Sequence, residues 1–393
     1  MAAAPVRIGL LWHSANSGNL GVAALTVANI SIARQVALEL GIEPRFVIVG
    51  MRDYGVSYVD ALDVSSFLID TRSLLQPGGY WSVLRDLDCV LDIGAGDSFA
   101  GIYGPKRFGF IWLSKMMAFA RRLPILLSPQ TIGPFEGAYK TLAGMAMKRA
   151  EAVVARDKPS LQVIRELAPK AKAVLATDVA FALPFEDRSG ERGDRRNGRI
   201  RVGVNVSGLL FTDAEAGRNR FGMQIDYAAY TRALLGALAE RSDVDLHLVP
   251  HATARNLPDD DDGRIADRMA AEFPDAIRVP DFSSPSEAKS YMSSLDFMVA
   301  GRMHACIGCF SAGVPVLPVA YSRKFSGLFG SLGYDWMIPT RGMGTEQAVA
   351  FSIDALAKRD RLREQEARGM AQIEELLENY RVELRALFRK VAR

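Results

Sequence analysis

The chain has 393 residues, of which 49% are hydrophobic and 24% are charged, and its formal net charge is +3. This length predicts two domains, and the composition is that of a soluble globular protein. The small net charge gives no support for nucleic-acid binding, although a local basic patch could serve an anionic substrate. Cys306 and Cys309 lie inside an apolar run, which predicts small buried thiols in a reducing compartment rather than a redox pair.

The N-terminal segment has one basic residue and a short apolar run, which predicts a strand over 6–12 and no signal peptide. No apolar stretch reaches the roughly 18 residues that cross a bilayer, so no membrane span is predicted. With four histidines in the chain, a zinc site has few candidate ligands, and we predict no metal. We therefore expect a cytoplasmic protein, whose charged amphipathic tail over 361–393 could lie at the inner face of the membrane but would more commonly pack on the protein.

Short apolar runs alternate with helical patterns along the chain, as in the βα units of parallel sheets. In the first half, strands are predicted at 6–12, 46–50, 89–93, 124–128, 152–155 and 174–183, with a helix over 22–40. The segment 186–199 has nine charged residues and three Gly, which favours a linker. In the second half, strands are predicted at 201–206, 244–250, 277–279, 297–300 and 314–320, and helices at 227–241, 285–294, 303–312 and 361–393. Ser284 is the expected N-cap before Pro285.

These elements predict the fold class α/β, with two Rossmann-like domains whose parallel sheets face a cleft. The predicted ranges are 1–185 for the N-terminal domain, 186–199 for the linker, 200–345 for the C-terminal domain and 346–393 for C-terminal helices. Ligands of such sheets bind at the carboxyl ends of the strands. The residues that directly follow each strand are therefore the candidate site residues.

In the N-terminal half, polar or Gly-rich turns follow three predicted strands. The turn over 13–21 (HSANSGNLG) brings small residues to a helix start, where backbone amides can approach an anion or a sugar hydroxyl, although a turn without ligand has the same pattern. It is not a GxGxxG fingerprint, and no acidic residue stands in the expected place after the second strand, so we predict no dinucleotide. Asp97, in the loop 94–98, could accept hydrogen bonds from a sugar or cap the following structure. Arg156 could simply pair with the adjacent Asp157.

The second half carries a stronger pattern of cations at strand ends. Arg302 and His304 open a helix after one strand, and Arg323 and Lys324 follow the next strand. His251 lies just past another strand end. Guanidinium groups, an ammonium and helix amides together favour a phosphate or a carboxylate. A single His is more commonly structural than catalytic, but two at strand ends beside an Arg favour proton transfer. For 259–262 (DDDD), a solvated loop and helix cap is favoured over a metal site.

Several motifs occur in a fixed order along the chain. They are GNLGVAAL, GAGDSF, SPQTIGP, ARDKPS, TDVAFALP, VGVNVSG, VPH, GRMHACI and GVPVLPVAYSRKF. Together they resemble the polysaccharide pyruvyl transferase family over about 6–333. Two motifs depart from the family pattern: Val22 and Ala23 replace an acidic pair, and GAGD replaces GGG or GGGS. Both lie in the half that should face the acceptor.

The resemblance implies a GT-B-like fold and transfer of a pyruvyl group from phosphoenolpyruvate to sugar hydroxyls as a ketal, in exopolysaccharide or cell-surface glycan synthesis. It implies His304 as the catalytic acid or base. The implied donor-binding residues are Arg302, Met303, His251, Arg323 and Lys324. The expected acceptor-binding residues are Asn16, Gly18, Asn19, Asp97, Ser98 and Gln130. Expected partners are phosphoenolpyruvate as co-substrate and a sugar, oligosaccharide or lipid-linked glycan, without nucleic acid; no step requires a metal or a redox cofactor.

Two alternatives remain open at this point. A GT-B-type glycosyltransferase would use Arg302, Arg323 and Lys324 for the diphosphate of a nucleotide sugar. A non-catalytic member of the family would bind glycan without turnover, and the altered N-terminal motifs support that possibility. The intact set of Arg302, His304 and Lys324 counts against it.

Overall fold

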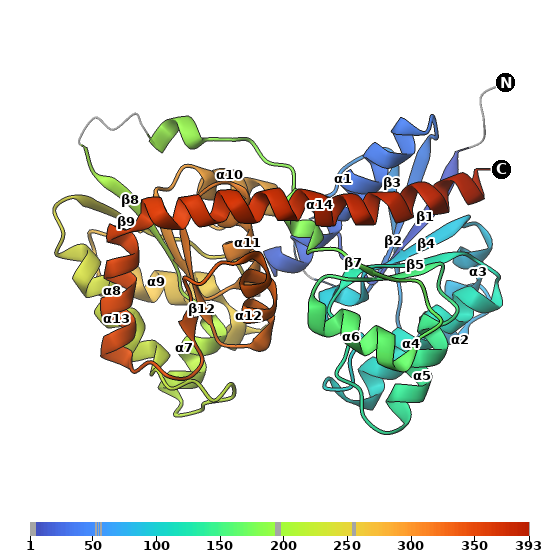
Figure 1. Cartoon of the computed structure of the whole chain (residues 1–393), viewed down its shortest axis with the longest axis horizontal. Helices are drawn as coiled ribbons and strands as arrows, with labels where there is room; N and C mark the ends of the chain where they lie inside the picture. The colour runs from blue at the N-terminus through green and yellow to red at the C-terminus, as the bar shows by residue number, and fades with distance from the viewer. Residues whose placement is uncertain are drawn as a thin grey trace. The chain divides into compact units, whose positions relative to one another are not determined.

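The computed structural model describes residues 5–51, 53, 55, 57–192, 198–253 and 257–392. The chain forms two compact units, each with its own parallel sheet (Figure 1). The first unit comprises Met1–Asn16, Leu25–Ala182 and Ile373–Arg393, and the second comprises Ser17–Ala24 and Leu183–Gln372. The main division therefore lies beside the predicted linker, whereas two short segments group differently from the predicted ranges.

Specific contacts account for both segments. Ser17–Ala24 groups with the second unit, where Asn19 forms an antiparallel β-bridge with Ala252. Ile373–Arg393, the end of the last helix, groups with the first unit, where the side chain of Tyr380 is fully buried. Neither contact has a signature in local sequence, because both join residues that are far apart along the chain.

The described residues of the first unit form a seven-stranded sheet, which is parallel throughout, in the order β3-β2-β1-β4-β5-β6-β7. The strands are β1 (Val6–Leu11), β2 (Pro44–Gly50), β3 (Val64–Leu68), β4 (Cys89–Asp92), β5 (Ile125–Gln130), β6 (Ala152–Ala155) and β7 (Ala173–Leu175). The helices are α1 (Leu20–Glu39), α2 (Thr71–Leu75), α3 (Tyr80–Arg85), α4 (Gly104–Ala120), α5 (Ala138–Met147) and α6 (Lys158–Leu167). Strands β4, β5 and β6 are buried at every position, as expected for a parallel sheet covered on both faces.

In the second unit, the described residues form a six-stranded parallel sheet in the order β10-β9-β8-β11-β12-β13. The strands are β8 (Ile200–Asn205), β9 (Val244–Leu248), β10 (Ile277–Arg278), β11 (Phe297–Ala300), β12 (Val316–Ala320) and β13 (Ile338–Pro339). The helices are α7 (Gly208–Glu215), α8 (Tyr227–Ala239), α9 (Asp262–Glu272), α10 (Pro285–Ser293), α11 (Met303–Ser311), α12 (Arg323–Phe329), α13 (Thr345–Ala357) and α14 (Arg359–Val391). The predicted N-cap of α10 is confirmed, because the Ser284 side chain accepts a hydrogen bond from Glu287 N.

The described part of the predicted linker is docked on the second unit. Arg192 donates to the backbone oxygens of Ser293, Ala312 and Gly313 at 2.7 to 2.9 Å. Glu186 N donates to Ser290 Oγ at 2.9 Å. Residues 193–197 of the predicted linker lie outside the described residues.

Helix α1 is the one helix of the described chain that is long and apolar enough to cross a membrane. Its most apolar window is 72% buried within the fold, which is the behaviour of a core helix. The tail helix α14 packs on the protein through an apolar face. Leu362, Ile373, Leu377, Leu384 and Phe388 of this face are each at most 1% exposed.

Candidate functional site

The carboxyl end of β11 carries the residues that the sequence singled out most strongly. Gly301 follows the strand, and a Cβ atom at this position would lie 2.5 Å from Tyr227 Oη, so no larger residue fits. Arg302 is the N-cap residue of α11, and its backbone N donates to Asn205 Oδ1 at 3.0 Å. Because Asn205 ends the neighbouring strand β8, this bond fixes the helix start to the sheet edge.

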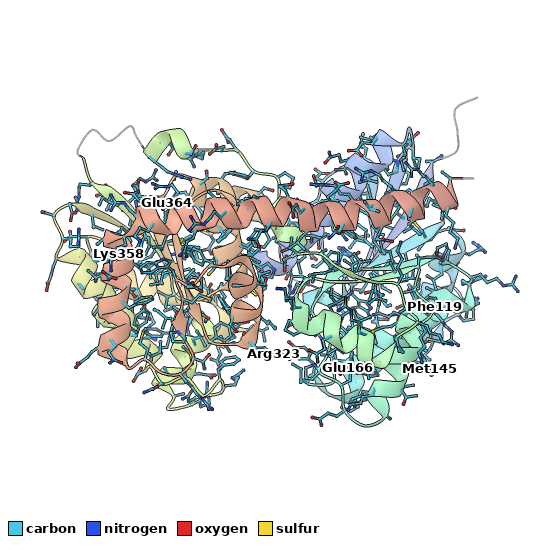
Figure 2. All side chains as sticks on the ribbon, in the orientation of Figure 1. Phe119, Met145, Glu166, Arg323, Lys358 and Glu364 are labelled. Carbon is cyan, nitrogen blue, oxygen red and sulfur yellow. The ribbon has the colours of Figure 1, made fainter. Side chains whose placement is uncertain are left out.

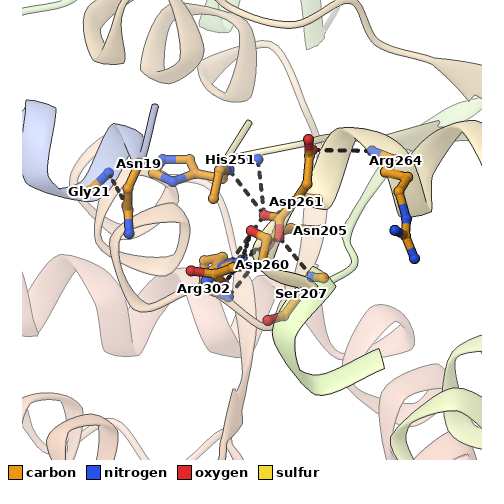
Figure 3. A network of polar contacts seen from close by, with 12 residues as sticks. Asn19, Gly21, Asn205, Ser207, His251, Asp260, Asp261, Arg264 and Arg302 are labelled. Carbon is orange, nitrogen blue, oxygen red and sulfur yellow. Dashed lines mark hydrogen bonds and ion pairs between the residues drawn. The ribbon is translucent and has the colours of Figure 1, made fainter. Parts of the chain in front are cut away.

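The guanidinium group of Arg302 is buried against two carboxylates (Figure 3). Nε and Nη2 donate to Asp262 Oδ1 at 3.0 and 2.7 Å, and Nη2 also lies 2.7 Å from Asp260 Oδ1. Burial lowers the pKa of Arg302, but the two carboxylates outweigh it and hold the pKa above its ordinary value. In the part of the chain that is described, Nη1 has no hydrogen-bond partner, so it is the atom of Arg302 left for a ligand.

Asp262 is the centre of this cluster, and the prediction of a solvated loop is wrong for it. The residue is 1% exposed, and its carboxylate accepts hydrogen bonds from four groups besides Arg302. These groups are Asn205 Nδ2 (3.0 Å), Gly208 N (2.8 Å), His251 N (3.2 Å) and Ala252 N (3.1 Å). The predicted helix cap is confirmed at the preceding residue, because Asp261 accepts from Arg264 N.

The predicted pair of histidines lies at the same strand ends. His251 is 3% exposed, and burial together with the positive charge of His304 and Arg302 lowers its pKa to about 3. His304 lies in the first turn of α11. The start of α1 packs on this histidine, since a Cβ atom at Gly21 would lie 2.4 Å from His304 Nδ1. The structure therefore brings Arg302, His304 and His251 together.

Gly18 and Asn19, expected on the acceptor side in the N-terminal domain, lie instead in the second unit. Thr253 N donates to Gly18 O at 2.9 Å, and Leu20 N donates to His251 O at 3.2 Å. Asn19 Oδ1 accepts from Gly21 N at 2.9 Å, which caps the start of α1 (Figure 3). These two residues therefore support the histidine pair.

The other predicted donor residues differ in exposure. Met303 is only 8% exposed and packs in the core, so its side chain offers little to a ligand. Arg323 is exposed and Lys324 is half-buried in the first turn of α12, where Figure 2 labels Arg323. Tyr321, two residues before Arg323, contacts Phe221 with ring centroids 4.7 Å apart and the two rings tilted.

In the first unit, the Gly-rich turn after β4 holds two predicted acceptor residues. Gly94, Ala95 and Gly96 all have positive φ, so the turn is left-handed and places the following residues above the strand end. Asp97 Oδ2 accepts from Tyr103 Oη at 2.7 Å, and Ser98 Oγ accepts from Arg107 Nη2 at 2.7 Å. The side chains of Asp97 and Ser98 therefore both form hydrogen bonds within the first unit.

A buried ion pair supports this turn from below. Lys115 Nζ lies 2.8 Å from Asp92 Oδ2, and both side chains are fully buried. Asp92 Oδ1 accepts from Gly94 N at 2.8 Å. The predicted residue Gln130 donates to Asp92 O, and its Oε1 lies 2.1 Å from the position of a Cβ at Gly94, so it packs on the turn.

One expectation for the first unit is wrong. Arg156 pairs with Asp178 at 2.6 Å rather than with Asp157, whose side chain caps α6 by accepting from Ser160 N. Asp53 comes three residues after β2 and accepts from Ser14 Oγ at 2.6 Å. The predicted acceptor residue Asn16 donates to the backbone oxygen of Asp53 at 2.9 Å.

Sequence reasoning missed Asp262, Asp53 and Asp178 because each owes its role to a partner far away in the chain. A usable signal existed for Asp178, since it lies within the quoted TDVAFALP motif. The described residues contain no group of three or more His, Cys, Asp or Glu side chains placed to hold a metal ion.

Solved structures with a similar fold include one described as a UDP-forming synthase and one described as a co-structure with UDP. An α,α-trehalose-phosphate synthase (UDP-forming) from Burkholderia vietnamiensis is 11% identical, with a TM-score of 0.56 over 100% of this chain and 98% of that one. The S. aureus MnaA–UDP co-structure is 13% identical, with a TM-score of 0.55 over 93% and 91%. At such identities the likeness shows the fold alone, which is the predicted two-domain GT-B type. No curated protein matches the sequence.

The family comparison agrees with the order of motifs in the sequence. The model of the family described as polysaccharide pyruvyl transferase matches residues 31–323. This range covers most of the chain, including β4, β11 and the cluster around Arg302. The chain therefore belongs to the polysaccharide pyruvyl transferase family.

Proposed function

We propose that this protein transfers the pyruvyl group of phosphoenolpyruvate to two hydroxyls of a sugar as a ketal, in the cytoplasm, during synthesis of an exopolysaccharide or cell-surface glycan. The observation that carries the proposal is the placement of His304 in the first turn of α11, beside a buried guanidinium whose Nη1 has no hydrogen-bond partner among the described residues. Family membership supports the same reaction class.

In this proposal Arg302 binds the donor through Nη1, while Asp262 and Asp260 hold the rest of the guanidinium in place. A guanidinium that is already held in place loses less side-chain entropy on binding than the guanidinium of a free surface arginine. Lys324, and Arg323 beside it, supply further positive charge for the phosphate and carboxylate. His251 is buried and neutral, so its role is to support His304 rather than to bind an anion.

His304 is proposed to act as acid and then as base. As the imidazolium, it gives its proton to the methylene carbon of phosphoenolpyruvate, and C2 becomes electrophilic. The oxygen of one sugar hydroxyl bonds to C2, and its proton goes back to the imidazole. The bond from C2 to the phosphate oxygen then breaks, and the second hydroxyl closes the ketal while its proton leaves with inorganic phosphate.

The first test measures phosphate release from phosphoenolpyruvate with a glycan acceptor, for wild type and for His304→Gln. A general acid–base group contributes roughly 10²- to 10⁴-fold, so the variant should lose at least about 100-fold in rate. His247→Gln is the matched control, because His247 lies on β9 and pairs with Tyr291 at 2.7 Å instead. Normal turnover in His304→Gln would contradict the mechanism.

The second test identifies the donor by thermal shift, because a ligand that binds the native state stabilises it by mass action. Phosphoenolpyruvate should raise the melting temperature, and UDP and GDP should not. A shift with a nucleotide alone would instead support a GT-B-type glycosyltransferase. Tight glycan binding without phosphate release would indicate a non-catalytic member of the family.

A further inference from the structure

A cavity of about 370 Å³ with polar and apolar walls lies in the first unit at the carboxyl ends of β1, β2 and β3. This volume falls within the range of small-molecule pockets, roughly 300–1,000 Å³. Its polar lining comes from His13, Ser14, Asn16, Asp53, Ser57 and Ser66. The carboxyl edge of a parallel sheet is where ligands of α/β proteins bind, so the position is that of a binding site.

Asp53 is held at the pocket by the turn after β1. Its Oδ2 accepts from Ser14 Oγ at 2.6 Å, and its backbone oxygen accepts from Asn16 Nδ2 at 2.9 Å. Tyr58 Oη donates to Ser14 O at 2.8 Å, which fixes the same turn from the other side. Within the described residues, Ser14 is the only side chain bonded to this carboxylate.

The charges of the described lining disfavour the donor in this pocket. Its described lining contains one carboxylate and no Lys or Arg. The ring of His13 is 2% exposed, and burial lowers its pKa to about 4, so this histidine is neutral near pH 7. Its nitrogens are occupied, with Nδ1 3.1 Å from Leu11 O and Nε2 2.8 Å from Asn29 Nδ2. A doubly anionic phosphoenolpyruvate or a nucleotide diphosphate would meet repulsion here.

The same chemistry suits a neutral sugar. A carboxylate accepts hydrogen bonds from two neighbouring hydroxyls, and serine hydroxyls and an amide can both donate and accept. Ile48, Phe67 and Leu68 give the pocket an apolar wall for the C–H face of a ring. We propose that this pocket holds one sugar ring of the acceptor, with Asp53 accepting hydrogen bonds from its hydroxyls. The assignment to the acceptor rests on the proposed function, whereas the binding of a sugar does not.

The test measures sugar binding without phosphoenolpyruvate, by saturation-transfer NMR on the full chain. The probes are the methyl glycosides of glucose, galactose and mannose. At least one should bind to wild type, and Asp53→Asn should weaken it about tenfold or more, because a hydrogen bond to a charged group is lost. Asp63→Asn is the matched control, since Asp63 pairs with Arg34 and does not line this pocket.

The outcomes separate this proposal from the proposed function. No binding of any probe, or equal binding by wild type and Asp53→Asn, overturns the sugar pocket even if phosphate release is normal. Binding that depends on Asp53, without phosphate release from phosphoenolpyruvate, keeps the pocket and overturns pyruvyl transfer. If wild type both binds the sugar and releases phosphate, Asp53→Asn should raise KM for the acceptor about tenfold and leave KM for phosphoenolpyruvate unchanged.

Discussion

Asp262 in the second unit shows how a buried charge can serve a site without touching a ligand. Arg302 is 8% exposed and Asp262 is 1% exposed, so neither charge is stabilised by water. Asp262 compensates by accepting from backbone groups of two segments, at Gly208 and at 251–252, as well as from Arg302. The pair therefore ties the ends of β8, β9 and β11 into one rigid edge, from which His304 projects.

Replacing Asp262 by Asn should destabilise the protein by about 3–5 kcal/mol, because breaking a buried ion pair leaves an uncompensated charge. The loss should be measured by urea unfolding at pH 7. Asp261→Asn is the control: Asp261 only caps α9, and Asn is an equally good cap, so its effect should be small. Equal stability of the two variants would show that the buried pair contributes little.

Gly21→Ala should impair catalysis more than it impairs folding. The added Cβ would lie 2.4 Å from His304 Nδ1, so the ring must move from its position. We expect phosphate release to fall at least tenfold, since small misplacements of reacting groups cost up to about 100-fold. Gly78→Ala is the control, because no atom lies within 4 Å of a Cβ there. Wild-type turnover in Gly21→Ala would show that α1 does not position His304.

The cluster around Arg302 could be predicted in part from sequence. Arg302, His304 and His251 follow apolar runs directly, so parallel-sheet geometry alone places them at one edge. Asp262 could not be found in this way, because it stands in an acidic run that resembles a solvated loop. Its burial depends on Asn205 and Gly208, more than 50 positions earlier, and no local pattern encodes that contact.

At the scale of elements, the strands that are buried on both faces were the easiest to predict. Strands such as β6 and β11 are continuous apolar runs, which periodicity finds easily. The edge strand β3 was missed because its sequence, VSSFL, carries two exposed serines. Helix α7 was missed because it starts directly after Ser207 and has only eight residues. Helix α14 contributes residues to both units, and this division depends on contacts between residues that are far apart in the chain.

Tyr380 joins α14 to the core of the first unit, and its hydroxyl can be tested directly. It donates to Asn29 Oδ1 at 2.7 Å and contacts Ser128 Oγ at 2.9 Å, in fully buried surroundings. Tyr380→Phe should cost about 1–3 kcal/mol, because Asn29 is left with an unsatisfied buried oxygen. Tyr139→Phe is the control: Tyr139 packs on Phe108, and its hydroxyl has no hydrogen-bond partner among the described residues. Urea unfolding should show a larger loss of stability for Tyr380→Phe than for Tyr139→Phe.

At the scale of the whole molecule, both units contain histidines that are buried as neutral rings. Burial lowers the pKa of His13 in the first unit to about 4, and that of His251 in the second to about 3. In the unfolded chain both return to an ordinary value near 6.5. Between these values the unfolded state binds more protons than the folded state, so acid favours unfolding. Glu366 acts in the opposite direction, because burial raises its pKa in the folded state.

Because these contributions oppose one another, the prediction concerns the difference between variants rather than the absolute stability. The stabilisation from a neutral His13 is fully present above pH 6.5 and is lost as the pH falls towards 4. His13→Asn keeps an N–H donor near Leu11 O but cannot gain a proton. We therefore expect wild type to lose more unfolding free energy than His13→Asn between pH 6.5 and pH 4.5, measured by urea titration at each pH. If the two lose the same amount, His13 is not the buried neutral ring that its contacts indicate.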